Sequence, residues 1–315
     1  MDLYRYHRPV LAERVVDYLV TLPEGIYVDC TVGGAGHARF IAERIGASGK
    51  LVCLDADTDA IHYAKSQLGL YPNVMLKQAY FDQLDVILDS QDLLPVQGFL
   101  FDLGISSFQV DSPTKGFSYQ ADGPLDMRFD RRQRLSAREV VNQYTQAQLE
   151  QILWKFGEEI RSRKIASRII EARQQSAIET TAKLREIVEK AVSPRMINKT
   201  LSRVFQAIRI EVNDELGRLS RALQRAFTCL NRGGRIAVIS YHSLEDRIVK
   251  DFFREKERDC ICPPELPECR CDKVSEMKIL TRKPVLPDKE EIRENPRSRS
   301  AKLRVAEKIV DYKVE

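Results

Sequence analysis

Features that define whole classes of protein are absent from this 315-residue sequence. No apolar run approaches the roughly 20 residues needed to span a bilayer, so we expect no association with a membrane. The first residues, MDLYRYHRPVLAERVVDYL, lack a basic segment followed by an apolar stretch, so we expect no signal peptide. The seven cysteines are an odd number, which in a chain without an export signal favours a reducing compartment. We therefore expect a soluble cytoplasmic protein.

Motifs of several enzyme classes are also missing. The chain has no G-x-S-x-G turn, no P-loop lysine and no convincing pair of catalytic carboxylates, which argues against acyl, phosphoryl and glycosyl transfer. The formal net charge of +4 permits a polyanionic partner without requiring one. The places where charge clusters therefore matter more than its total.

β-rich runs alternate with helical patterns in the N-terminal third of the chain. We expect strands at Ile26–Cys30, Leu51–Asp55, Val74–Lys77 and Phe99–Leu103. The segments HARFIAERI and TDAIHYAKSQL between them carry apolar residues at helical spacing. This alternation predicts a parallel sheet with helices on its faces.

The pattern changes after this sheet region. From Gln109 to about Asn213 no strand is convincing and helical composition dominates. GGRIAVISYH is then typical of a buried strand, and MKILTRK and AKLRVAE are strand-like. We therefore predict an α/β fold in two parts, residues 1–108 and 214–315, interrupted by an all-helical domain at 109–213.

A glycine-rich turn, TVGGAGH, follows the first strand, which ends at Asp29. A dinucleotide-binding turn needs a third glycine for close packing of helix on strand, and Arg39 occupies that position. Adenosylmethionine fits better, because it has no phosphates and its cationic groups favour a nearby carboxylate such as Asp29. Asp55, at the end of the second strand, can accept hydrogen bonds from both ribose hydroxyls.

The match to the common methyltransferase glycine pattern is partial. Of its three glycine positions only Gly33 is kept, and Thr31 and Ala35 occupy the other two. A turn that is tight only for packing stays open as an alternative.

The fourth strand ends at Asp102, followed by the loop residues Ser106 and Ser107. Ligands of open α/β sheets bind at this end of the strands. Methylation of a pyrimidine carbon would need a cysteine nucleophile here, and the loop has none. Direct in-line methyl transfer to an exocyclic amine remains, with Asp102 and the two serines as candidate acceptors for the amine hydrogens. Turn capping is the alternative role for either serine.

Four motifs together resemble one family: TVGGAGH, FDLGISSFQVD, KGFSYQADGPLDMRFD and ISYHSLEDRIVKDFF. The sequence is similar to the bacterial methyltransferases that modify N4 of a cytidine in 16S ribosomal RNA, in the decoding centre of the small subunit. The resemblance runs from His7 almost to Glu307. It implies a Rossmann-like catalytic domain with an inserted helical substrate-binding domain. It also implies adenosylmethionine contacts, at Ala35, Gly36, His37, Asp55, Phe81, Asp102 and Gln109.

A few positions depart from the family pattern. Ala35 stands where glycine is usual, and we expect only a slight change in cofactor affinity. Phe129 and Tyr241 replace Met and Phe, both mild changes. The segment SPRMINKTLSRVFQAIRIEVNDEL keeps FQAIRIEVNDEL, but its upstream half diverges, so RNA contacts there are less secure.

Basic clusters predict an RNA-binding surface. Arg195, Lys199 and Arg203 are four residues apart, which would place them on one helix face. RENPRSRSAKLR, with Arg297 and Arg299, is a second cluster, and Arg128 with its basic neighbours is a third. Taken singly, each of these basic clusters is more often part of an ordinary solvent-exposed surface than a binding site.

A cytosine must leave its stack to present its amine. Phe117 and Tyr119 are therefore candidates for stacking on the base, and Asp126 is a candidate acceptor near it. Tyr241 and His242 are expected on the opposite wall of the pocket, with a structural hydrogen bond as the alternative role for His242.

The segment CICPPELPECRC contains Cys260, Cys262, Cys269 and Cys271. Four thiolates can hold a structural zinc ion, although the C-x-C spacing differs from the usual C-x-x-C. Reduced thiols in a surface loop are the alternative.

Two other functions stay open. One is amine methylation of DNA or another RNA, although DLGISSF lacks the prolines usual there. The other is a ribosome-assembly factor that binds adenosylmethionine. The sequence leaves open whether the chain is a monomer or a homodimer.

Overall fold

The computed structural model describes residues 9–263 and 269–313. Residues 1–8, at the start of the segment expected to contain no signal peptide, and Pro264 and Pro267 of the cysteine segment lie outside these ranges. The chain forms two compact units. We call residues 1–104 and 216–315 the sheet unit, and residues 105–215 the helical unit.

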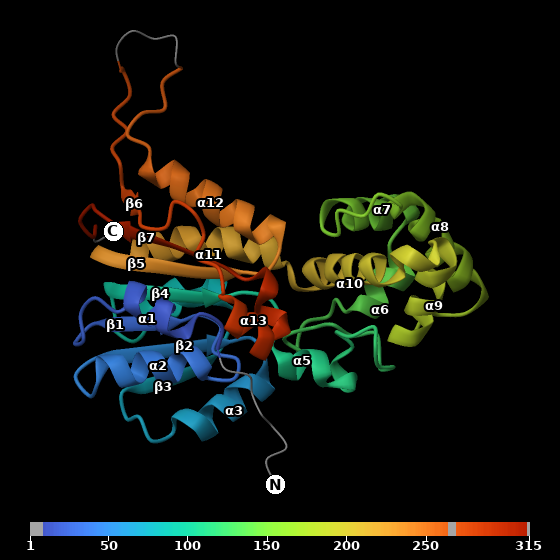
Figure 1. Cartoon of the computed structure of the whole chain (residues 1–315), viewed down its shortest axis with the longest axis horizontal. Helices are drawn as coiled ribbons and strands as arrows, with labels where there is room; N and C mark the ends of the chain where they lie inside the picture. The colour runs from blue at the N-terminus through green and yellow to red at the C-terminus, as the bar shows by residue number, and fades with distance from the viewer. Residues whose placement is uncertain (1–8, 264–268, 314–315) are drawn as a thin grey trace. The chain divides into compact units, whose positions relative to one another are not determined.

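The sheet unit is built on a seven-stranded sheet in the order β3-β2-β1-β4-β5-β7-β6 (Figure 1). The first five strands of the chain are parallel, whereas β7 is antiparallel to both β5 and β6. The strands are β1 (Ile26–Asp29), β2 (Lys50–Asp55), β3 (Val74–Gln78), β4 (Val96–Asp102), β5 (Leu230–Ser240), β6 (Met277–Ile279) and β7 (Lys302–Lys308).

Alternate residues of the central strands enter separate hydrophobic cores on the two faces of the sheet. Phe99 and Phe101 of β4 belong to the core that includes α4 (Leu84–Asp89), α11 (Glu215–Cys229) and α12 (Ser243–Glu257). Leu100, between them, belongs to the core that includes α1, α2 and α3. Strands buried on both faces explain the nearly continuous apolar runs in the sequence.

The helices of the sheet unit lie between its strands along the chain, except α1, which precedes β1 (Figure 1). They are α1 (Ala12–Leu19), α2 (Gly36–Ile45), α3 (Thr58–Leu68), α4 (Leu84–Asp89), α11 (Glu215–Cys229, from the last residue of the helical unit), α12 (Ser243–Glu257) and α13 (Lys289–Glu294), with 3-10 turns η1 (Phe81–Gln83) and η4 (Pro296–Ser300).

The helical unit packs around its longest helix, α10, which contacts α6, α7 and α9 (Figure 1). Its apolar core includes Leu153, Ile169, Val188 and Val204, which are fully buried. Its elements are α5 (Ser107–Asp111), η2 (Pro113–Lys115), α6 (Ala137–Gln143), α7 (Gln146–Lys155), α8 (Ser162–Gln175), α9 (Thr181–Ala191), η3 (Pro194–Met196) and α10 (Ile197–Asn213).

The predicted strands are all present, and the predicted absence of strands between Gln109 and Asn213 is confirmed apart from an isolated bridge between Pro124 and Thr180. The division between the units falls after Gly104 and after Glu215, whereas the sequence placed it after residues 108 and 213. Ser106 and Ser107 therefore belong to the helical unit. No helix among the described residues is both long enough and apolar enough to cross a bilayer.

Candidate functional site

Three carboxylates stand at the ends of neighbouring parallel strands in the sheet unit. Asp29 ends β1, Asp55 ends β2 and Asp102 ends β4. β1 lies between β2 and β4, and the chain order reverses on its two sides. Such a switch point is where open α/β sheets bind their ligands.

The glycine-rich turn is fixed to these strand ends by side-chain hydrogen bonds. The Gly33 amide donates to Asp55 Oδ2 at 2.9 Å. Thr31 Oγ1 accepts from the Asp102 amide at 2.7 Å, and the Thr31 amide donates to Asp29 Oδ1 at 3.1 Å. The turn therefore crosses the ends of all three strands.

The backbone of the turn is left-handed at two positions. Gly33 has a φ of 46° and Ala35, which caps α2, has a φ of 60°. Alanine pays a steric cost of about 1–2 kcal/mol in this conformation, whereas glycine does not. This explains why glycine would suit position 35 on backbone grounds alone, which the sequence did not reveal.

Asp29 offers a site for a positive group. Its side chain is buried, and its Oδ2 atom has no hydrogen-bond partner among the described residues. Burial raises the pKa of Asp29 to about 7, although the charge of His37 opposes the shift. A buried polar atom without a partner is rare in folded proteins and needs an explanation. A cationic group of a bound cofactor would supply the missing partner, so this position fits the adenosylmethionine that the sequence predicts.

Asp102 differs from Asp29 because both of its oxygens have protein partners. The Tyr241 hydroxyl donates to Oδ1 at 2.9 Å, and His37 Nδ1 lies 3.4 Å from Oδ2. Burial, together with the charge of Asp102, raises the pKa of Tyr241 well above its usual value. The phenol therefore stays protonated and keeps donating to Asp102.

His37 lies between two acceptors. Its Nε2 atom is 2.9 Å from the Val10 carbonyl oxygen, and its Nδ1 atom faces Asp102. Both nitrogens can donate at once only in the imidazolium form. Burial disfavours that charged form, but the hydrogen bond and charge of Asp102 outweigh it and raise the pKa of His37. His37, predicted as a cofactor contact, thus orients Asp102.

Gly36 and Phe81 have packing roles in the sheet unit. A Cβ atom added at Gly36 would lie 3.0 Å from Pro9, so the absence of a side chain allows this close approach. Phe81 begins η1 and packs edge-on against Phe101, with 5.8 Å between the ring centroids. Stacking of Phe81 on adenine stays a prediction.

His242 and Tyr241 also have clear structural partners. His242 caps α12 by accepting from the Glu245 amide, and Glu245 accepts in return from the Tyr241 amide at 2.9 Å. The structural hydrogen bond considered for His242 is therefore present. The link between Tyr241 and Asp102 was missed in the sequence, because residues 139 positions apart give no local signal.

In the helical unit, Ser106 and Gln109 bind each other at the start of α5. The Gln109 amide donates to Ser106 Oγ at 3.2 Å, and Gln109 Oε1 accepts from the Ser106 amide at 3.0 Å. This reciprocal capping box fixes both side chains. Ser107 is the first residue of α5.

Asp126 and Arg128 form a two-point ion pair. Arg128 Nε lies 2.8 Å from Asp126 Oδ1, and Nη2 lies 2.7 Å from Oδ2. Burial alone would raise the pKa of Asp126, but the hydrogen bonds from Arg128 outweigh it and hold this pKa below its usual value. Arg128 also donates to two backbone carbonyls, those of Arg131 and Gln133. Both side chains therefore stabilise the fold of this segment.

The predicted stacking residues contact other rings of the helical unit. Phe117 is buried and stacks on Phe129, with 5.5 Å between centroids. Tyr119 is half-buried and meets Phe205 edge-on at 5.5 Å. Neither ring is a free platform in this conformation.

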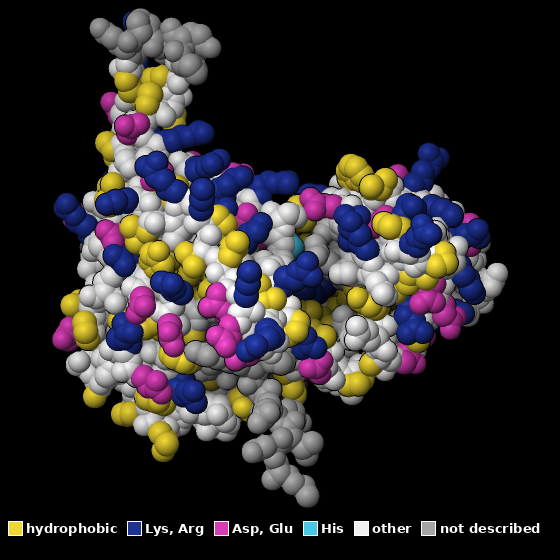
Figure 2. Space-filling model, in the orientation of Figure 1, with side chains coloured by type: hydrophobic (Ala, Val, Ile, Leu, Met, Phe, Trp, Pro, Cys, Tyr) yellow, Lys and Arg dark blue, Asp and Glu magenta, His cyan; other side chains and the backbone are white. Residues whose placement is uncertain are grey.

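The predicted phosphate-binding residues are mostly exposed. Arg195 and Lys199 are exposed, as are Arg297 and Arg299 on η4, whereas Arg203 is half-buried, 3.6 Å from Glu159. Arg195 lies in η3, before α10 begins, so the expected helix face holds only for Lys199 and Arg203. Figure 2 shows Lys and Arg side chains spread over the visible face of each unit, with acidic side chains among them.

The four cysteines of CICPPELPECRC come together in the sheet unit, after the C-terminal end of α12. α12 spans 15 residues, about 22 Å at 1.5 Å per residue. Its other end carries His242, next to Tyr241 and the strand-end carboxylates. The cysteines are therefore separate from that site.

The sequence of this chain matches one protein family and several named relatives. The sequence model of the MraW methylase family matches residues 5–309. A protein named ribosomal RNA small subunit methyltransferase H from Caldicellulosiruptor saccharolyticus is 47% identical over 304 residues, which cover 96% of this chain and 99% of that protein. Proteins of the same name from Clostridium botulinum and Clostridioides difficile are 48% and 46% identical, with the same coverage of both chains. A family match over nearly the whole length shows that the chain belongs to the MraW methylase family.

Proposed function

We propose that this chain transfers a methyl group from adenosylmethionine to N4 of a cytidine in 16S ribosomal RNA. The observation that carries the cofactor assignment is the unpartnered, buried Oδ2 atom of Asp29 beside the glycine-rich turn. The names of its relatives support ribosomal RNA of the small subunit as the substrate. The fourth-strand loop supports an amine as the acceptor, since it contains no cysteine to attack a pyrimidine ring.

Adenosylmethionine supplies a methyl group activated by a sulfonium. Asp29 would pair with a cationic group of this cofactor. Asp55 accepts from the Gly33 and Asp57 amides, and it would also accept from the ribose hydroxyls of the cofactor. The left-handed turn at Gly33 and Ala35 keeps the backbone close to these two carboxylates.

Asp102 would align the acceptor amine. Its orientation is fixed by Tyr241 and His37, and its side chain is 25% exposed, so it can accept a further hydrogen bond. An amine hydrogen directed at Asp102 turns the nitrogen lone pair towards the methyl group. Asp102 would thus hold the amine in line with the activated methyl group that the bound cofactor would supply, and the amine would release its proton to water. No strong general base is needed, and positioning supplies much of the rate.

The helical unit would bind the RNA. Arg195 and Lys199, together with Arg297 and Arg299 of the sheet unit, are exposed cations suited to phosphates. Ser106, Ser107 and Gln109 are fixed at the start of α5, directly after β4. Phe117, Tyr119 and the Asp126–Arg128 pair, which make their contacts within the unit, would support the surface that receives the unstacked base.

Product identification tests this proposal. The purified protein is incubated with methyl-labelled adenosylmethionine and, separately, with unmodified small subunits, naked 16S RNA and DNA, and labelled nucleosides are identified by mass spectrometry. We expect N4-methylcytidine in ribosomal RNA. Label only in DNA or in a carbon-methylated base would overturn the proposal. Cofactor binding without any transfer would favour an assembly factor instead.

A further inference from the structure

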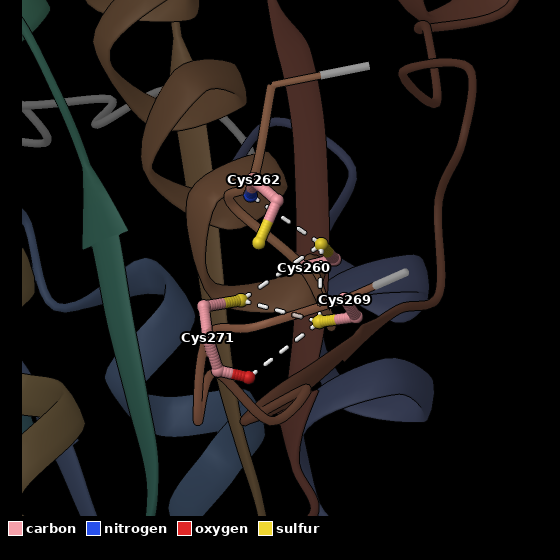
Figure 3. A group of neighbouring side chains, drawn as sticks. All are labelled: Cys260, Cys262, Cys269 and Cys271. Carbon is pink, nitrogen blue, oxygen red and sulfur yellow. Dashed lines mark hydrogen bonds between the residues drawn. The ribbon is translucent and has the colours of Figure 1, made fainter. Parts of the chain in front are cut away.

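The segment between α12 and β6 contains two C-x-C pairs that face each other. Cys260 and Cys262 lie on the outgoing arm, residues 258–263, and Cys269 and Cys271 lie on the returning arm, residues 269–276. Figure 3 shows the sulfur atoms of both arms directed towards a common centre.

The sulfur positions match the size of a single tetrahedral metal site. Cys269 Sγ lies 3.5 Å from both Cys260 Sγ and Cys271 Sγ, and Cys271 Sγ lies 3.8 Å from Cys260 Sγ. All four sulfurs are within 4.8 Å of one another. Zinc–thiolate bonds of about 2.3 Å in a tetrahedron require sulfurs about 3.8 Å apart. A disulfide would require about 2.05 Å.

The backbone around the sulfurs is arranged for thiolates. The middle residue of each pair donates to a cysteine of the opposite arm: the Ile261 amide to Cys271 Sγ at 3.4 Å, and the Arg270 amide to Cys262 Sγ at 3.3 Å. The Cys262 amide also donates to Cys260 Sγ at 3.4 Å. Donors placed in this way orient metal ligands in proteins and stabilise the charge of metal-bound thiolates.

Apart from the contacts of Glu276 with Lys256 and Lys273 at the end of the returning arm, the two arms bury little that could stabilise them. None of the described residues between 258 and 276 is buried, and Ile261 and Val274 expose large apolar side chains. A segment that buries so little apolar surface cannot offset the entropy cost of its order. In small units without a core, a metal ion commonly provides that free energy.

We propose that Cys260, Cys262, Cys269 and Cys271 bind one structural zinc ion that clips the two arms together. Soft thiolates in tetrahedral geometry select zinc among the common divalent ions of the cell. Four protein ligands leave no open position for a substrate, so the ion is structural. The other three cysteines, Cys30, Cys53 and Cys229, are buried elsewhere in the sheet unit and take no part.

Metal analysis of the intact protein tests this proposal independently of methyl transfer. We expect protein purified under reducing conditions, without added chelator, to contain one zinc ion per chain by plasma mass spectrometry. Cys262→Ser and Cys271→Ser should lose the zinc, whereas Cys229→Ala should keep it. Replacement by cobalt should give the ligand-field spectrum of a tetrahedral tetrathiolate.

Limited proteolysis provides a second measurement that does not depend on whether the variants bind metal tightly. With zinc bound, trypsin should cut slowly after Arg258 and Arg270, and chelation should expose these bonds while the rest of the chain resists. Equimolar iron in place of zinc would overturn the choice of metal. Four free thiols or two disulfides without metal, or full zinc content in both serine variants, would overturn the site itself.

Discussion

Carboxylates that motifs singled out in the two units have opposite surroundings. In the sheet unit, Asp29 has a buried oxygen without a partner and a pKa raised to about 7 by burial. In the helical unit, Asp126 has both oxygens bound by Arg128, which holds its pKa below the usual value despite burial. A motif thus identifies a residue as a candidate. The contacts of that residue in the structure show whether it is available to a ligand or already bound within the fold.

The largest effect should follow a change at Asp102. Asp102→Ala removes the partner of Tyr241 and His37 and the proposed acceptor for the amine, so we expect methyl transfer to fall by roughly 10²–10⁴-fold. Asp102→Asn keeps the shape of the side chain without its charge. Its rate of methyl transfer should lie between those of Asp102→Ala and the native protein. Single-turnover transfer to unmodified small subunits measures the effect. Activity within a factor of about three of the native value (under 1 kcal/mol) would place the chemistry elsewhere.

Variants of Arg128 and Arg195 compare an arginine that stabilises the fold with one proposed to bind RNA. Arg128→Ala breaks the two hydrogen bonds to Asp126 and the two to backbone carbonyls, so we expect the free energy of unfolding to fall by at least about 2 kcal/mol. Arg195→Ala removes an exposed cation, so stability should stay unchanged, while RNA affinity falls and the slope of its salt dependence decreases by about 1.

Urea denaturation and RNA binding at several salt concentrations measure the two arginine variants side by side. If Arg128→Ala left the free energy of unfolding unchanged and altered only the salt dependence of RNA binding, Arg128 would be an RNA-binding residue. The structural role given to the Asp126–Arg128 pair would then be wrong.

A smaller effect is expected at Ala35. Ala35→Gly removes the steric cost of a left-handed alanine, about 1–2 kcal/mol, against roughly 0.4–1 kcal/mol of extra chain entropy. We expect a net gain of up to about 1.6 kcal/mol in the free energy of unfolding. Ala42→Gly, in the interior of the same helix, is the matched control and should lose about 1 kcal/mol. Equal losses in both variants would show that the positive φ at Ala35 carries no strain.

Much of the sheet unit could be predicted from sequence because its signals are local. Each buried strand is a short apolar run, and Asp29, Asp55 and Asp102 mark the strand ends. The antiparallel placement of β7 could not be predicted, because a strand-like run such as AKLRVAE does not specify its neighbour.

The site was harder to predict because its contacts are distant in sequence. Tyr241 reaches Asp102, and His37 reaches both Val10 and Asp102, which no spacing rule encodes. In the helical unit, aromatic and charged residues of one motif pair with each other, as Asp126 does with Arg128. The sequence shows which residues are present but not that they satisfy one another.

The central claim, that Asp29 awaits a cationic cofactor, gives a pH dependence with a definite sign. In the free protein the folded state has the higher pKa for Asp29, about 7. As pH rises, the unfolded chain therefore loses this proton at a lower pH than the folded protein does. Asp29 should therefore make the free protein less stable as pH rises from about 4 to 7. A cation prefers the ionised form, so cofactor affinity should increase over the upper part of this range.

Calorimetric titration with adenosylmethionine at pH 6 and pH 7 tests this claim most directly. The range stays below the α-amine pKa of about 7.7–8.0, so the charge of the cofactor is nearly constant. With a pKa of about 7, the ionised fraction of Asp29 rises from about a tenth to a half, and affinity should rise about fivefold. Asp29→Asn should bind more weakly at pH 7 and lose this dependence. Equal affinity at both pH values in the native protein, or the same slope in the variant, would contradict the account.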